Sequence, residues 1–301
     1  MKKRNLETPQ RIRSAATIVL VRDLEGEILV YLLRRSPESA FFPGNYVFPG
    51  GAVDRGDRDS GLWQDHVDMD EERISESLGG GLSAEDALAY GVAAIRETFE
   101  EAGVLLARRN GVSGSQYETV CDLRRGGDLP RGWLRERVLS EGWKLSFSDL
   151  ARWSHWITPE AMPKRFDTRF FLAFMPPGQE CVPDAKETVD GVWISPLKGL
   201  EENLKGTIPL SPPTLITLHE LTGYQDLGTL RKEAETRAWG EPRLPVFVRL
   251  PKGGVIIEPW DPFYGESIEI ATEALPDAVL PPGTPFSRIW LHRGIWHPIQ
   301  T

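Results

Sequence analysis

The stretch from Ser83 to Gly103 constrains the fold most strongly, because it predicts a helix with two chemically opposite faces. Ser83 is a suitable N-cap, and Gly103 is suited to the left-handed position at which helices commonly end. Within an arc of roughly 60°, at about 100° per residue, lie the apolar side chains of Leu88, Val92, Ile95 and Phe99. The sequence therefore predicts that this face packs against a core.

Three glutamates, Glu97, Glu100 and Glu101, lie on the opposite side of this helix, directly after Arg96. Like charges three or four residues apart on a helix repel, at roughly 0.2–0.5 kcal/mol per pair. Bound Mg²⁺ or Mn²⁺ would offset that cost, and Arg96 could hold a carboxylate by a charge-assisted hydrogen bond. The alternative is an ordinary solvated helix face. The string R-E-x-x-E-E-x-G arises by chance at roughly one start position in a million, which favours the metal site.

The remaining segments predict a mixed α+β protein. Runs rich in β-branched and aromatic residues predict strands at 14–23, 27–36, 153–159, 166–176 and 191–196. A segment with proline in its first turn predicts a helix at 211–224. Polar stretches near 58–82 and 111–149 look like insertions, the first ending on the loop Gly79–Gly81. Beyond residue 228 we expect a charged helix and several short strands.

Composition narrows the class of protein. The 301 residues carry a net charge of −9 and a pI near 5.2, which argues against a surface that coats nucleic acid. Cys121 and Cys181 are the only cysteines, so we expect neither a disulfide framework nor a thiolate zinc site. The basic N-terminus lacks the apolar segment of a signal peptide, and no apolar run is long enough to span a membrane. We therefore expect a cytoplasmic enzyme, and we count a homodimer among the assemblies to test.

Other catalytic motifs are missing from the sequence. The five histidines show no zinc-ligand spacing, and no G-x-S-x-G nucleophile elbow occurs. No lysine follows the three glycines at 79–81 as a phosphate-binding P-loop requires.

The string at 96–104, with Gly51 upstream, resembles the Nudix box, whose pattern is G-x5-E-x7-R-E-U-x-E-E-x-G-U, where U is apolar. Here the two halves are separated by a segment about 31 residues longer than the pattern allows, and Thr98 replaces an apolar residue. Asp57 stands where the pattern has its first glutamate, with Glu85, or no residue at all, as the alternatives. A long insertion after "FFPGNYVFPGGAVD" is similar to the branch of the mammalian peroxisomal coenzyme A diphosphatase and its bacterial relatives.

This resemblance implies a Nudix α/β/α sandwich with a mixed β-sheet over residues 13–225, two insertions, and a C-terminal extension at 226–301 packed on it. It implies metal-dependent hydrolysis of a small nucleoside diphosphate derivative, coenzyme A or acyl-coenzyme A, to phosphopantetheine and 3′,5′-ADP. Two alternatives stay open. One is hydrolysis of NADH, ADP-ribose or a nucleotide sugar, and the other is a module that senses a nucleotide without hydrolysing it.

Residue roles also follow from the resemblance. Glu97, Glu100, Glu101 and the carbonyl of Gly50 would hold Mg²⁺ or Mn²⁺, and one glutamate of the cluster would activate water. Glu187 occupies the place of a further acid, in a loop before a later strand. With Arg96, these acids form the predicted catalytic set.

Basic and aromatic residues outside the box would select the substrate. Candidates for binding the nucleotide or its 3′-phosphate are Arg34, Arg35, Lys164, Arg165 and Arg169. Candidates for stacking an adenine or lining a pantetheine channel, with a core role as the alternative, are Phe41, Phe42, Trp153 and Trp156. The segment "LLRRSPESAFFPG" matches only part of the coenzyme A motif of other Nudix hydrolases, because it lacks an arginine between the serine and the glycine.

Overall fold

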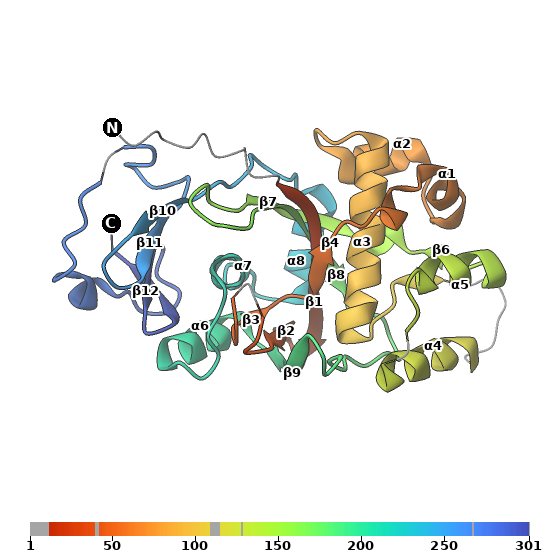
Figure 1. The fold of residues 1–301 in the computed structure, drawn as a ribbon, viewed down its shortest axis with the longest axis horizontal. Coiled ribbons are helices and arrows are strands. Elements are labelled where there is room, and N and C mark those ends of the chain that lie inside the picture. Colours follow the sequence, from red (N-terminus) through yellow and green to blue (C-terminus); the bar gives the residue numbers. More distant parts are fainter. Residues whose placement is uncertain (1–11, 40–41, 109–114, 128, 267, 301) are drawn as a thin grey trace, which may run out of the picture.

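A seven-stranded mixed sheet lies at the centre of the computed structural model, which describes residues 12–39, 42–108, 115–127, 129–266 and 268–300 (Figure 1). Its strands are β1 (Arg13–Leu24), β2 (Glu27–Arg35), β3 (Tyr46–Val47), β4 (Gly50–Ala52), β7 (Ala151–Ile157), β8 (Phe166–Phe174) and β9 (Thr188–Ile194). The main order is β3-β2-β1-β8-β7, with β4 paired to β1 and β9 to β2. Only the central β1–β8 pair among these is parallel. The expected mixed sheet is therefore confirmed.

Strand β1 contributes to the core on each face of the central sheet, because successive side chains of a strand point to opposite faces of a sheet. Ala16, Ile18 and Leu20 are buried in the core beneath α3 (Ala84–Ala102). Val19 and Val21 are buried in the core on the other face. Because both faces are covered here, the centre of the strand, Ile18 to Val21, is continuously apolar and buried, whereas both ends of the strand carry polar residues.

Helix α3 begins and ends where the sequence predicts. The hydroxyl of Ser83 accepts a hydrogen bond from the N–H of Asp86 at 3.1 Å, and Gly103 follows the helix in the left-handed conformation. The four predicted core residues of this helix are all buried against the sheet. Local capping and periodicity thus suffice to define this element.

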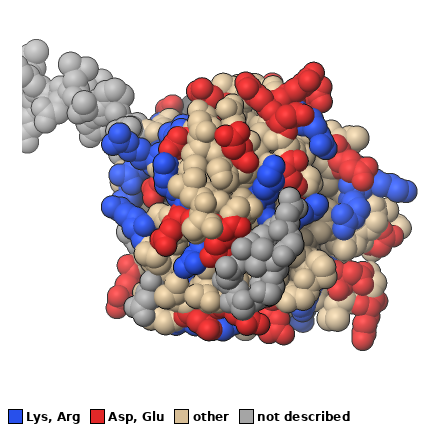
Figure 2. All heavy atoms as spheres, turned by 90° about the vertical axis from the view of Figure 1, so that its right-hand side faces the viewer, with Lys and Arg blue, Asp and Glu red and all other residues tan. Residues whose placement is uncertain are grey.

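Both insertions fold against the side of the sheet that carries α3 (Figure 1). The first is partly helical, with α1 (Ser60–Trp63), α2 (Glu71–Ile74) and a π-helical turn (Ser75–Gly79). The second contains β5 (Ala107–Arg108), α4 (Ser115–Gly126), α5 (Trp133–Glu141) and β6 (Lys144–Leu145). Acidic and basic side chains are interspersed over this side of the molecule (Figure 2).

The opposite face is covered by α6 (Pro196–Lys205), α7 (Pro212–Leu221) and α8 (Leu227–Thr236). Beyond α6 and α7 lies a second sheet, in the order β10 (Val246–Arg249), β11 (Gly254–Ile257), β12 (Arg288–His292) and β13 (Ile295–Ile299) (Figure 1). The charged helix and the short strands expected after residue 228 are confirmed. Helix α6 was not predicted from the sequence. Across the described ranges, no helix combines the length and apolar character needed to cross a bilayer.

Candidate active site

The first two residues of β4 are glycines that contact the acidic face of α3 and strand β1. A Cβ atom on Gly51 would lie 2.5 Å from the carboxyl carbon of Glu97, and one on Gly50 would lie 2.4 Å from the carbonyl oxygen of Ala16. Real Cβ atoms essentially never come that close to another atom. Glycine at position 51 therefore lets the strand run directly over Glu97, and glycine at position 50 lets it lie close against β1.

Arg96 organises the acidic face. Its guanidinium donates to Asp57 at 3.0 and 2.8 Å, to Glu97 at 2.8 Å and to Glu100 at 3.0 Å. It also donates to the carbonyl of Ala52 in β4 at 3.0 Å. The planar fork of arginine suits this two-nitrogen grip on a carboxylate, which lysine cannot reproduce. Asp57, weighed against Glu85 from the sequence, is buried within this network, whereas Glu85 is exposed in the first turn of α3.

Residues of the second insertion form hydrogen bonds to the C-terminal end of α3. The indole N–H of Trp133 donates to Glu100 at 2.7 Å. Arg124, which is 6 % exposed, donates to the carbonyls of Glu100 at 3.0 Å and Glu101 at 2.7 Å. A cation that binds the last carbonyls of a helix also interacts favourably with the helix dipole. The insertion therefore fixes the C-terminal end of α3, where the cluster lies.

Burial changes the ionisation of the cluster. Glu101 is 6 % exposed, and one of its oxygens accepts a hydrogen bond from the N–H of Gly50 at 2.8 Å. Desolvation and then the nearby charge of Glu97 raise the pKa of Glu101 well above its ordinary value. Desolvation raises the pKa of Glu97 to about 7, although the adjacent Arg96 lowers it. The positive charges of Arg96 and Arg35 therefore do not fully offset the effect of burial on the pKa values of these two carboxyl groups.

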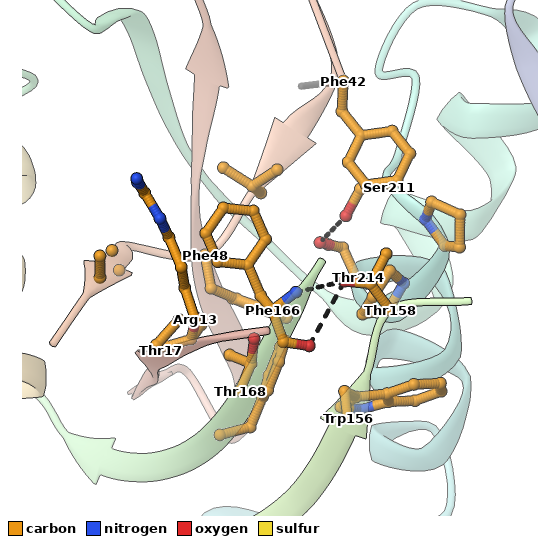
Figure 3. Close-up of a pocket in the computed structure, with 18 of the residues that line it drawn as sticks. Arg13, Thr17, Phe42, Phe48, Trp156, Thr158, Phe166, Thr168, Ser211 and Thr214 are labelled. Carbon is orange, nitrogen blue, oxygen red and sulfur yellow. Dashed lines mark hydrogen bonds between the residues drawn. The ribbon is translucent and has the colours of Figure 1, made fainter. Parts of the chain in front are cut away.

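A cavity of about 520 Å³ opens over the cluster. Its acidic end contains Glu97, Glu100, Glu101 and Glu187, beside Arg35 and Arg96. The cavity continues between apolar walls that include Phe48, Phe166 and Trp156 (Figure 3). Hydroxyl groups interrupt these walls, where Ser211 bonds Thr214 at 2.8 Å and Thr158 bonds the backbone of Phe166 (Figure 3).

The donor set at the acidic end fits a hard divalent cation. The groups are carboxylates next to a glycine-rich backbone, and Mg²⁺ and Mn²⁺ select oxygen ligands. The raised pKa values of Glu97 and Glu101 mean that their ionised forms are destabilised, and a bound cation would stabilise those forms. Among the described residues, however, no three acidic, histidine or cysteine side chains are already grouped as metal ligands. The ligand set Glu97, Glu100, Glu101 and Gly50 stays a prediction.

Other predicted residues are divided between the cavity and the surface. Glu187 is exposed in the loop directly before β9, lines the acidic end and affects Glu101 electrostatically. Arg35 lines the same end, whereas Arg34 is exposed and does not line the cavity, because neighbouring residues of β2 point to opposite faces. Arg165 donates to the carbonyl of Thr158 at 3.1 Å and is not among the lining residues. Of these three arginines, the structure therefore brings only Arg35 to the site.

The remaining substrate candidates divide in the same way. Trp156 and Phe42 line the cavity, whereas Trp153 is buried in the core on the α7 side. Lys164 is exposed, and the guanidinium of Arg169 packs 5.1 Å from the ring of Trp239, away from the cavity. Phe41 lies outside the described residues.

Several side chains at the site were not predicted from the sequence, among them Arg13, Arg124 and Trp133. Arg13 lines the cavity from the start of β1. Nothing in the local sequence marks these residues, because each reaches the site through contacts between distant segments.

Comparison with known proteins places this architecture in a family. Residues 75–221 match the family model described as the NUDT19 Nudix domain. The human acyl-coenzyme A diphosphatase NUDT19 is 30 % identical, over 93 % of this chain and 89 % of the human protein. The chain belongs to the NUDT19 family of Nudix proteins. The Xenopus laevis member, named acyl-coenzyme A diphosphatase NUDT19, is 26 % identical over 81 % of this chain and 73 % of its own length.

The family assignment also has structural support. A NUDIX hydrolase from Alicyclobacillus acidocaldarius, of known crystal structure, is 27 % identical and has a TM-score of 0.59. The match covers 78 % of this chain and all of that one. The Nudix fold expected from the split box is thereby confirmed, together with its mixed sheet.

Proposed function

We propose that the protein is a hydrolase that cleaves the diphosphate bond of coenzyme A or an acyl-coenzyme A. The observation that carries this proposal is the similarity over 93 % of the chain to a human protein named as an acyl-coenzyme A diphosphatase. The cavity supports it, because an acidic end suited to a metal-bound diphosphate continues into apolar walls suited to an aliphatic arm. The products would be 3′,5′-ADP and phosphopantetheine or its acyl derivative.

The residues at the acidic end suggest how the bond is cleaved. Mg²⁺ or Mn²⁺, held by Glu97, Glu100, Glu101 and the carbonyl of Gly50, would neutralise diphosphate oxygens and lower the pKa of bound water. A carboxylate of the cluster accepts the proton of the attacking water, and the P–O bond to the leaving phosphate breaks. Arg96 keeps the carboxylates in place by donating to Glu97 and Glu100. The proposal assigns the base to the cluster rather than to one glutamate.

We assign two arginines to the selection of the substrate. Arg35 and Arg13 are the lining cations outside the cluster, and we assign them to the phosphates of the nucleotide arm. Two alternatives remain testable. One is cleavage of NADH, ADP-ribose or a nucleotide sugar, and the other is binding without cleavage.

Mass-resolved product analysis tests the proposal. The protein is incubated with coenzyme A, acetyl-coenzyme A, NADH or ADP-ribose, with and without Mg²⁺ or Mn²⁺. Metal-dependent release of 3′,5′-ADP from the first two supports the proposal. Cleavage of NADH or ADP-ribose alone would overturn the coenzyme A assignment, and no cleavage at all would favour the sensing module.

The cellular compartment and the assembly stay predictions. Cell fractionation tests the expected cytoplasmic location, and light scattering on the purified protein tests whether it is a homodimer.

A further inference from the structure

The carboxyl group of Glu258 is buried without a hydrogen-bond partner. The residue follows β11 in the C-terminal extension and is 0 % exposed. Neither of its carboxyl oxygens has a hydrogen-bond partner among the described residues. Its backbone is nevertheless fixed, because its N–H donates to the carbonyl of Ser287 and its carbonyl accepts from Asp261, each at 2.9 Å. A buried carboxyl left without a partner costs stability and calls for an explanation.

A second acid of the extension shows what a purely structural carboxylate looks like here. The side chain of Asp261 accepts from the hydroxyl of Ser287 at 2.7 Å and from Arg288 at 2.7 and 3.0 Å. These bonds hold the pKa of Asp261 below its usual range, although burial alone would raise it. Glu258, three residues away, has no such bonds. Stabilisation of the extension therefore does not account for its carboxyl group.

Arg243, the cation whose charge acts on Glu258, makes no hydrogen bond to its carboxyl group, and its own Nη1 nitrogen is also buried without a partner. Arg243 donates to Glu220 at 2.6 Å and stacks 5.1 Å from the ring of Trp156. Burial raises the pKa of Glu258 to about 8, and the charge of Arg243 only partly offsets this effect. Arg237 also contacts Glu220, at 3.5 Å, so two arginines offset the charge of Glu220, and no described arginine hydrogen-bonds the carboxyl group of Glu258.

Glu258 lies in the wall of the cavity that begins at the acidic cluster. The extension also supplies Pro245, Phe247, Ile256 and Trp296 to the same wall. A ligand group that enters this apolar region meets one strong hydrogen-bond acceptor. A carboxyl oxygen accepts a hydrogen bond in either protonation state, so the group that complements it in both states is an N–H donor.

We propose that Glu258 is a specificity-determining residue that accepts a hydrogen bond from an N–H group of the substrate. This inference rests on the proposed function, because coenzyme A carries such groups in both arms, namely the amides of pantetheine and the amino group of adenine. The C-terminal extension thereby forms part of the substrate site. Because Glu258 is 0 % exposed, the substrate reaches its carboxyl group only when the cavity wall shifts, but no internal hydrogen bond of that group has to break.

Binding and turnover of three variants test the proposal. Glu258→Leu removes the acceptor, Glu258→Gln keeps a carbonyl acceptor of the same shape, and Glu269→Leu makes the same change at an exposed glutamate of the extension. We measure the Kd of 4′-phosphopantetheine and of 3′,5′-ADP by calorimetry with Mg²⁺, the KM and kcat for coenzyme A, and the Tm of each free protein.

The expected pattern separates recognition from a structural role. Glu258→Leu should raise the KM, and the Kd of one fragment, about tenfold with kcat little changed. Glu258→Gln should restore most of the affinity, Glu269→Leu should match the wild type, and the Tm of Glu258→Leu should not fall. A change confined to phosphopantetheine identifies an amide as the donor, and a change confined to 3′,5′-ADP identifies the adenine amino group.

Two results would overturn the proposal. One is an unchanged Kd for both fragments in Glu258→Leu, and the other is a wild-type protein that binds neither fragment. Failure of the proposed function is seen separately, as wild-type protein that binds a fragment but does not cleave coenzyme A.

Discussion

Replacing Gly51 with alanine adds one methyl group next to the predicted metal-binding carboxylate. The new Cβ would lie 2.5 Å from the carboxyl carbon and one oxygen of Glu97, and ordinary contacts begin near 3.4 Å. Either the carboxylate of Glu97 or the backbone of β4 must therefore move by about 1 Å. A misplacement of that size can cost about 100-fold in rate. The backbone at Gly51 is outside the left-handed region, so the effect comes from this contact alone.

We expect Gly51→Ala to lower kcat for coenzyme A about 100-fold and to lower the free energy of unfolding by about 1–3 kcal/mol. Steady-state kinetics at saturating metal and urea denaturation provide the two numbers. Gly56→Ala is the matched control, because a Cβ there would have nothing within 4 Å. The control should keep wild-type activity.

A folded Gly51→Ala protein with kcat within threefold of the wild type would refute this reasoning. It would mean either that Glu97 takes no part in the reaction or that the backbone of β4 moves without any loss of activity. Equal losses in both glycine variants would also contradict it, because only one of them touches the cluster.

The other predictions concern the groups that hold the cluster and the extension. Arg96→Lys loses the two-nitrogen grip on Asp57 and should lower kcat about 10- to 100-fold in a folded protein, so wild-type kinetics would contradict it. Arg124→Met removes the donors that bind the last carbonyls of α3 and should cost about 1–3 kcal/mol in urea denaturation, whereas an unchanged midpoint would exclude this role. Burial raises the pKa of Glu258 to about 8, so between about pH 5 and 8 the native carboxyl keeps a proton that the unfolded chain releases. Wild-type stability should therefore fall with pH relative to Glu258→Gln, by up to about 1.4 kcal/mol per pH unit, and denaturation curves with a constant difference at pH 5 and 8 would disprove it.

The elements predicted correctly from the sequence are those whose signals are local. Helix α3 is defined by its own cap, its periodicity and its terminal glycine. Helix α6 was missed because Gly199 in its interior argues against a helix. A Cβ at Gly199 would lie 2.7 Å from the side chain of Leu218, so the glycine allows α6 to pack closely on α7. That requirement comes from tertiary contact and is invisible in the local sequence.

The site shows the same division between local and distant signals. The string around Glu97, Glu100 and Glu101 identifies the acidic cluster, because one helix carries all three. The groups that hold or complete the cavity, such as Trp133 and Glu258, come from segments that only the fold brings together. Spacing along the chain carries no information about such contacts.

The most direct test of the central claim is the rate of coenzyme A cleavage by Glu101→Gln and Glu85→Gln beside the wild type, at saturating Mg²⁺ or Mn²⁺. Both variants make the same change on helix α3, but Glu101 is buried at the cavity and Glu85 is exposed at the start of the helix. We predict that Glu101→Gln loses at least about 100-fold in kcat and that Glu85→Gln keeps wild-type activity. Undiminished cleavage by Glu101→Gln, or an equal loss in both variants, would contradict the assignment of catalysis to this cluster.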